Sequence, residues 1–131
     1  MLGEMIEEGR GKITCQRVLS DGKFEVTFQA SGKIFGLDAT NIGTYSSKMM
    51  PDGTLYGKGQ GALMTADGQM SSWKGSGVGK FTGKGAGVSF RGAIYHRTNS
   101  PKLARLNGLA VVFEYETDEA AKTHNKSWEW K

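Results

Sequence analysis

Two side chains in this sequence have types and positions that could support acid–base chemistry. His96 shares the two-residue alternation of Phe90 and Ile94, so its imidazole should face the same side of a strand, near the strand's end. Glu129 is a second candidate if it is buried, because burial raises the pKa of a carboxyl group. The structural alternatives are a hydrogen-bonded histidine at the rim and a solvent-exposed glutamate. The environment of His96 and Glu129 must decide between these interpretations.

No metal-binding, cofactor-binding or nucleophile motif is present. The chain has 2 His and 1 Cys, which do not have the spacing of a zinc site, and Cys15 is more typical of a small buried hydrophobe than of a nucleophile. Three Gly-x-Gly-x-Gly runs occur at 57–61, 75–79 and 83–87. None carries the Ser or Thr after Gly-Lys that a P-loop requires. We therefore expect no metal and no cofactor.

The elements that must position these residues are predicted from turn signals. Ser-Asp-Gly at 20–22, Pro-Asp-Gly at 51–53, Asp-Gly at 67–68, Thr-Gly-Lys-Gly at 82–85 and Thr-Asp-Glu at 117–119 favour tight reversals. Runs between them are rich in β-branched and aromatic residues with a period of two. They predict eight strands at about 4–19, 23–35, 37–49, 54–65, 69–81, 86–97, 108–117 and 121–130. Only 100–106, with Ser before Pro, has a helical pattern.

Eight short-connected strands predict a single domain over residues 1–131. An open sheet of this size would leave two exposed edges, whereas closure removes them. We therefore expect an all-β fold, an eight-stranded antiparallel up-and-down β-barrel with one short connecting helix. Such a barrel is just wide enough to be filled by side chains or to hold one small ligand.

The glycine runs are interpreted as strand positions rather than phosphate loops. A hairpin centred on Gly68 would place Gly57 opposite Gly79, Gly59 opposite Gly77 and Gly61 opposite Gly75. A following loop of two or four residues would place Gly77 opposite Phe90. One face, predicted to be the interior, then interleaves glycine with Leu55, Leu63, Trp73, Phe81, Val88, Phe90 and Ile94. The missing side-chain volume makes room either for neighbouring rings or for a ligand.

Two hairpins leave the direction of further side chains open. A three-residue loop at 51–53 would place Tyr45 inward opposite Gly59, whereas a four-residue loop would turn it outward. An odd final loop would pair Glu114 with Lys122 and point Thr123, Asn125, Ser127 and Glu129 inward. An even loop would instead bring Trp128 and Trp130 inside. The expected ligand-binding residues are Tyr45, Leu63, Trp73, Phe90, Ile94, Phe113, Tyr115 and Asn125.

Charge is concentrated in the middle of the chain. The 131 residues carry a net charge of +4 and 20 Gly, and residues 53–107 hold 8 basic side chains against the single acid Asp67. This distribution allows a nucleic-acid or polyanion interface on an outer face, with Tyr56 and Tyr95 as stacking rings. The basic residues concerned are Lys58, Lys74, Lys80, Lys84 and Arg91. A structural or assembly protein without ligand is a further alternative.

The segment from Pro51 to Tyr95, together with LARLNGLAVVFEYE at 103–116 and the ending WEWK, resembles a family of short, largely uncharacterised bacterial and archaeal proteins. That family in turn resembles the allene oxide cyclase-like and dirigent-like eight-stranded barrels. The resemblance implies a central cavity for a hydrophobic molecule, cyclisation or coupling guided by shape, and homodimers or homotrimers. No catalytic residue is carried over, because no catalytic motif of the cyclases matches this chain.

From the residues and the resemblance together, we expect a protein that binds a small, mainly apolar molecule in the barrel, with isomerase- or cyclase-type activity as one form of that function. No secretory signal is apparent, and the longest clearly apolar run, 109–113, is too short for a membrane helix. We therefore expect a cytoplasmic protein without a membrane segment.

Overall fold

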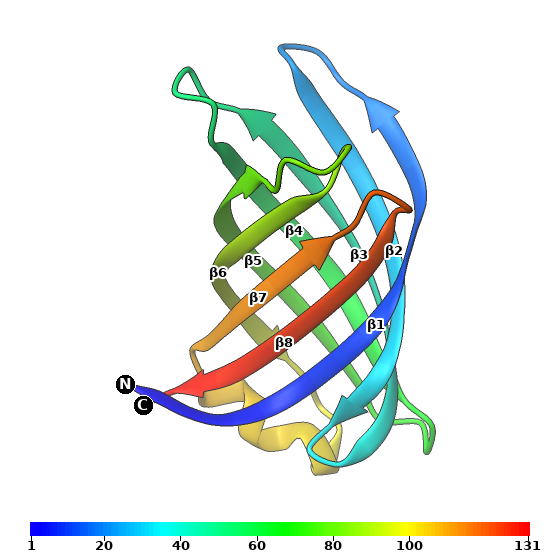
Figure 1. Cartoon of the computed structure of the whole chain (residues 1–131). Helices are drawn as coiled ribbons and strands as arrows, with labels where there is room; N and C mark the ends of the chain where they lie inside the picture. The colour runs from blue at the N-terminus through cyan, green and yellow to red at the C-terminus, as the bar shows by residue number, and fades with distance from the viewer.

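The computed structural model describes all 131 residues and shows a closed antiparallel barrel in which each strand pairs with the next and β8 pairs back with β1 (Figure 1). The predicted fold class is confirmed. The strands are β1 (Leu2–Val18), β2 (Lys23–Ile34), β3 (Leu37–Met49), β4 (Leu55–Thr65), β5 (Met70–Phe81), β6 (Val88–Arg97), β7 (Val111–Thr117) and β8 (Lys122–Trp130).

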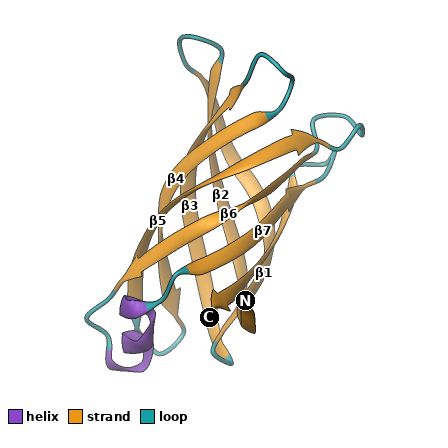
Figure 2. Cartoon of the chain, turned by 90° about the vertical axis from the view of Figure 1, so that its left-hand side faces the viewer, coloured by secondary structure: helices purple, strands orange, loops and turns teal.

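The single helix lies at one end of the barrel (Figure 2). This 3₁₀-helix, η1 (Pro101–Gly108), begins with proline at its first position, where the missing N–H is tolerated. Its side chains Leu103 and Leu106 are fully buried against the barrel core. Both chain termini lie at the same end (Figure 1), where the amino group of Met1 donates a 2.6 Å hydrogen bond to the carbonyl of Lys131. The helix therefore covers this end of the interior.

The register of the central hairpins differs from the prediction by two residues. Gly57 lies opposite Gly77 and Gly59 opposite Gly75, while Gly61 faces Trp73. The reason is that the β4–β5 reversal is centred on Asp67, with Gly68 taking a positive φ of 89° one residue later. Because side chains alternate with a period of two, a shift of two residues changes the pairing but leaves every side chain on its predicted face.

The next reversal, between β5 and β6, is longer than expected. Six residues, 82–87, connect β5 to β6, so Gly79 lies opposite Phe90 and Gly77 opposite Gly92. Phe81 lies at the end of β5 beside this loop and is 49% exposed, so its predicted interior position is wrong. The other interior positions of this face follow the predicted alternation.

Tyr45 and the last hairpin resolve the two open alternatives. Tyr45 lies opposite Gly59 and points inward, because the β3–β4 reversal is centred on Asp52. The β7–β8 loop is odd, which turns Asn125 and Ser127 inward. The predicted pairing of Glu114 with Lys122 is wrong, since Glu114 lies opposite Lys126. The carboxylate of Asp118 accepts hydrogen bonds from the backbone N–H groups of residues 120 and 122, which centres this turn further along the chain.

The interior glycines make room for aromatic rings. A β-carbon at Gly43 would lie 2.6 Å from the Trp73 ring and 2.7 Å from the Phe28 ring, which is closer than real atoms approach. A β-carbon at Gly61 would overlap the Trp73 ring as well. Part of the missing side-chain volume is therefore filled by neighbouring rings, and a second part remains as the cavity described below.

Candidate functional site

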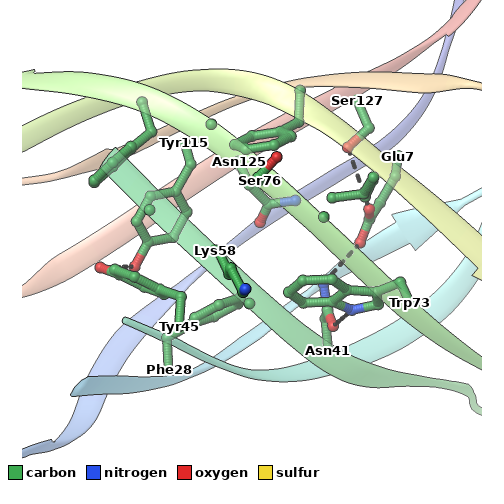
Figure 3. Close-up of a pocket in the computed structure, with 17 residues that line it drawn as sticks. Glu7, Phe28, Asn41, Tyr45, Lys58, Trp73, Ser76, Tyr115, Asn125 and Ser127 are labelled. Atoms are coloured by element: carbon green, nitrogen blue, oxygen red, sulfur yellow. Dashed lines mark hydrogen bonds between the residues drawn. The ribbon is translucent and has the colours of Figure 1, made fainter. Parts of the chain in front are cut away.

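The barrel contains a cavity of about 80 Å³ between its eight strands, partly open to the outside (Figure 3). Its lining consists of aromatic rings, glycines and a few polar side chains: Glu7, Phe28, Asn41, Tyr45, Gly57, Lys58, Gly59, Trp73, Gly75, Ser76, Gly77, Phe90, Ile94, Phe113, Tyr115, Asn125 and Ser127. Seven of the eight expected ligand-binding residues are among them. The exception is Leu63, which is fully buried in the core and does not border the cavity.

Aromatic rings form one wall of the cavity. The ring centroids of Phe28 and Tyr115 are 5.3 Å apart, and those of Tyr45 and Tyr115 are 5.4 Å apart in an edge-to-face arrangement. The hydroxyl groups of Tyr45 and Tyr115 share a 3.1 Å hydrogen bond. Burial raises the pKa of Tyr45 to about 12 and that of Tyr115 further, so both phenols stay neutral at physiological pH. This wall therefore offers ring surface and one neutral polar pair.

Polar side chains gather at the other end of the cavity, around the carboxyl group of Glu7 (Figure 3). The amide nitrogen of Asn41 donates to Glu7 at 3.5 Å, and the hydroxyl of Ser127 donates to the second carboxyl oxygen at 3.5 Å. The carbonyl oxygen of the Asn41 side chain in turn accepts a 2.8 Å hydrogen bond from the Trp73 indole. Asn41 thus links the carboxyl group to the indole and fixes the orientation of both.

Burial changes the acidity of Glu7. The residue is 6% exposed, and desolvation raises its pKa from 4.5 to about 7, although hydrogen bonds from Ser127, Asn125 and Asn41 act in the opposite direction. A carboxyl group with this pKa exchanges its proton near neutral pH, so it can accept or donate a proton at small energetic cost. Glu7 therefore has the acid–base properties that were expected of His96 or Glu129.

Glu7 reaches the interior because of a β-bulge in β1. The pairing of β1 with β8 shifts between Met5, which lies opposite Trp128, and Glu7, which lies opposite Ser127. The extra residue, Ile6, is buried as well, so two consecutive side chains enter the core. Alternation counted forward from Ile6 would turn Glu7 outward. Alternation counted back from Gly11 and Gly9 turns Glu7 inward, and this spacing, which resembles the other glycine-rich interior faces, was the signal available in the sequence.

Phe28 occupies a central place in the aromatic wall, although it was not among the expected ligand-binding residues. Phe28 packs against Tyr45, Trp73 and Tyr115, with ring centroids between 5.3 and 6.4 Å apart. Its alternation with Val26 and Ala30 marks it as an interior residue of β2. No local feature of the sequence indicates that the ring borders a cavity.

The cavity wall is thin between β4 and β5. Three successive rungs of this pair are Gly57 with Gly77, Lys58 with Ser76, and Gly59 with Gly75. The four glycines place no side chain in the interior, and the outward-pointing Lys58 and Ser76 also border the cavity. Backbone alone therefore separates this part of the cavity from the outer surface.

The two candidate catalytic residues lie away from the cavity lining. His96 is buried, 4% exposed, and its Nδ1 lies 3.2 Å from the Ser71 hydroxyl; burial lowers its pKa to about 4, so the imidazole is neutral at physiological pH. The side chain of Glu129 is 14% exposed and pairs with Arg105 at 3.3 Å. Neither residue is among those that border the cavity.

Other sequence predictions concern the outer surface. Lys58, Lys74, Lys80 and Lys84 are exposed, whereas Arg91 pairs with Glu114 at 3.7 Å and with Glu116 at 3.4 Å. Cys15 is exposed, so its predicted burial is wrong; the register shift between Ile13 and Cys15 in the β1–β2 pair interrupts the alternation there.

No group of three or more His, Cys, Asp or Glu side chains could hold a metal ion. The structure contains no helix with the length and apolar character needed to span a membrane.

By its fold and its interior cavity, the chain is one of the small closed β-barrels with a hollow interior. No family model and no curated protein matches the chain. Solved structures do match: a protein of unknown function from Clostridium acetobutylicum ATCC 824 has a TM-score of 0.81 at 14% identity and covers 98% of both chains.

Two further structures are similar. A conserved protein of unknown function from Rhodopseudomonas palustris has a TM-score of 0.76 at 12% identity and covers 99% of both chains. A β-barrel-like protein from Acinetobacter baumannii AYE has a TM-score of 0.80 at 12% identity, with 100% of this chain and 96% of that chain covered. The chain therefore shares its barrel with these three bacterial proteins, and at these identities the likeness shows the fold alone.

Proposed function

We propose that this protein binds a small, mainly apolar molecule inside its barrel. The observation that carries the proposal is the cavity itself, whose lining combines ring surface with polar groups at two ends. Binding sites for small molecules typically have this composition, an apolar lining with a few polar groups that fix the orientation of the ligand. Hydrophobic burial supplies affinity, while Glu7 and the Tyr45–Tyr115 pair orient the molecule.

The size of the cavity limits the ligand. An engineered apolar cavity of roughly 150 Å³ holds benzene, so the present cavity of about 80 Å³ suits a molecule of only a few non-hydrogen atoms, or the end of a longer one. A longer ligand would extend toward the thin β4–β5 wall or the end of the barrel opposite η1. Isomerase- or cyclase-type chemistry, a homodimer or homotrimer and a cytoplasmic location remain predictions that belong to this proposal.

The three tryptophans provide a direct test. Trp73 borders the cavity, whereas Trp128 lies on the outward-facing alternation of β8 and Trp130 is 61% exposed. In a titration with short alcohols followed by NMR, we expect the indole N–H signal of Trp73 to shift and saturate. The other two indole signals serve as internal controls, and Trp73→Phe assigns the first. Equal small shifts of all three signals, or none, would overturn the proposal.

A further inference from the structure

Glu7 is the only acidic side chain in the buried interior, and it has no cationic partner. The ion pairs of the structure involve other carboxylates, and no Lys, Arg or His nitrogen lies within 4.0 Å of Glu7. Its hydrogen-bond donors are the neutral side chains of Asn41 and Ser127, both at 3.5 Å, and of Asn125. Strong bonds to a carboxylate are shorter, about 2.7–2.9 Å, so the bonds from Asn41 and Ser127 satisfy the group only weakly.

An unpaired carboxyl group in the interior destabilises the folded protein when it ionises. The raised pKa of Glu7, about 7, reflects this cost. Proteins that keep such a group usually pair it with a charge or use it. Since no side chain of this chain supplies the positive charge, a molecule that enters the cavity is the remaining source.

The rest of the lining also suits a positive charge. The cavity is bordered by the rings of Phe28, Trp73 and Tyr115, among others, and the faces of aromatic rings attract cations, most strongly where water is excluded. The other ionisable side chains that border the cavity are Tyr45 and Tyr115, which are neutral, and Lys58, which points outward and is exposed. No interior positive charge therefore competes with a bound cation.

We propose that the cavity selects small molecules in which a protonated amine is attached to a short apolar group, with Glu7 as the residue that determines this specificity. The inference rests on the proposed function, because it assumes that the cavity takes up a small molecule. The ammonium group binds the carboxylate of Glu7 and the apolar group lies against the rings. A neutral or anionic molecule of the same shape gains no ion pair.

The test compares matched pairs of probes that differ only in the polar group. Propylamine and 1-propanol, and butylamine and 1-butanol, are titrated into the folded protein, with the Trp73 indole signal as the readout. At pH 8 we expect each amine that fits to bind at least about tenfold more tightly than its alcohol, which corresponds to about 1.4 kcal/mol. We expect the amine affinity to fall as the pH is lowered through 7, because Glu7 then gains a proton.

Glu7→Gln is the decisive variant, since it keeps the shape and one of the two hydrogen-bonding oxygens but removes the charge. The preference for the amine should disappear while alcohol binding is retained, and Glu7→Asp, which keeps the charge on a shorter side chain, should retain part of the preference. Glu8→Gln, a change on the outer surface next in the chain, is the control and should leave the preference intact.

The outcomes separate the two proposals. If the alcohols bind but the amines bind no more tightly, or if the preference survives in Glu7→Gln, the amine specificity is wrong while the cavity remains a binding site. If neither alcohols nor amines shift the Trp73 signal, the proposed function itself fails.

Discussion

Replacing Glu7 by Gln should change the pH dependence of folding stability. In the unfolded chain Glu7 ionises at its ordinary pKa of 4.5, whereas in the folded protein burial raises this value to about 7. Between these two values the unfolded state releases a proton that the folded state retains. Stability is therefore highest below pH 4.5 with respect to this group and is lost as the pH rises through 7.

The magnitude follows from the difference between the two pKa values. Each unit corresponds to about 1.4 kcal/mol, so ionisation of Glu7 costs the folded wild-type protein about 3 kcal/mol above pH 7. Gln carries no charge, and its single side-chain oxygen can still accept one of the two hydrogen bonds that Asn41 and Ser127 donate to different oxygens of Glu7. We expect Glu7→Gln to be more stable than wild type by up to about 3 kcal/mol at pH 8, a rise in Tm of roughly 10 °C. Near pH 4 the two proteins should be nearly equal.

The assay is urea unfolding of both proteins at pH values from 4 to 8, with the difference in unfolding free energy plotted against pH. His96 contributes an opposite slope, because its pKa of about 4 lies below the ordinary 6.5 and stability is lost as the pH falls between these values. This contribution is the same in both proteins and cancels in the difference. A difference that does not change with pH would refute the reasoning, since it would mean that Glu7 titrates alike in the folded and unfolded states.

Three further predictions concern other interior residues. As the pH falls from 6.5 to 4, the unfolding free energy of wild type should decrease because buried His96 resists protonation. In His96→Gln this decrease should be smaller by up to about 3 kcal/mol, measured in the same urea experiment. Gly61→Ala should lower the unfolding free energy by about 1–3 kcal/mol, because the new methyl group would overlap the Trp73 ring, and near-ultraviolet circular dichroism should report the displaced indole. Leu63→Ala should cost about 2–5 kcal/mol, since Leu63 is fully buried, yet leave alcohol binding at Trp73 unchanged because Leu63 does not border the cavity. A loss of alcohol binding in folded Leu63→Ala would show that the lining extends further than the structure indicates.

The sequence predicted which face most of the cavity-lining side chains occupy, because side-chain alternation is a local property. Tyr45, Trp73, Phe90 and Tyr115 all face the cavity as expected, and a two-residue error in register did not alter which face each one occupies. The choice between a filled and a hollow interior was not predictable. It depends on how rings from different strands share the volume beside the glycines, as where Phe28 and Trp73 meet over Gly43.

The surroundings of the two acid–base candidates, His96 and Glu129, could not be predicted from the pattern of a single strand. His96 does face inward, but it pairs with Ser71 away from the cavity, and Glu129 is neutralised by Arg105 from η1. These partners lie on other elements, so no pattern within one strand reveals them. The group with altered acidity beside the cavity is Glu7, which the alternation rule did not single out.

The sequence by itself determined the number of strands, their turns, the short helix and the inward face of most strands, because steric preferences of turn residues and the two-residue period act over a few neighbouring residues. Only the tertiary structure decided the site at Glu7. Closure of the barrel pairs β1 with β8, and a bulge in that pairing brings Glu7 to Ser127, 120 residues away. The acidity of the carboxyl group follows from this burial, and burial depends on every strand of the closed barrel.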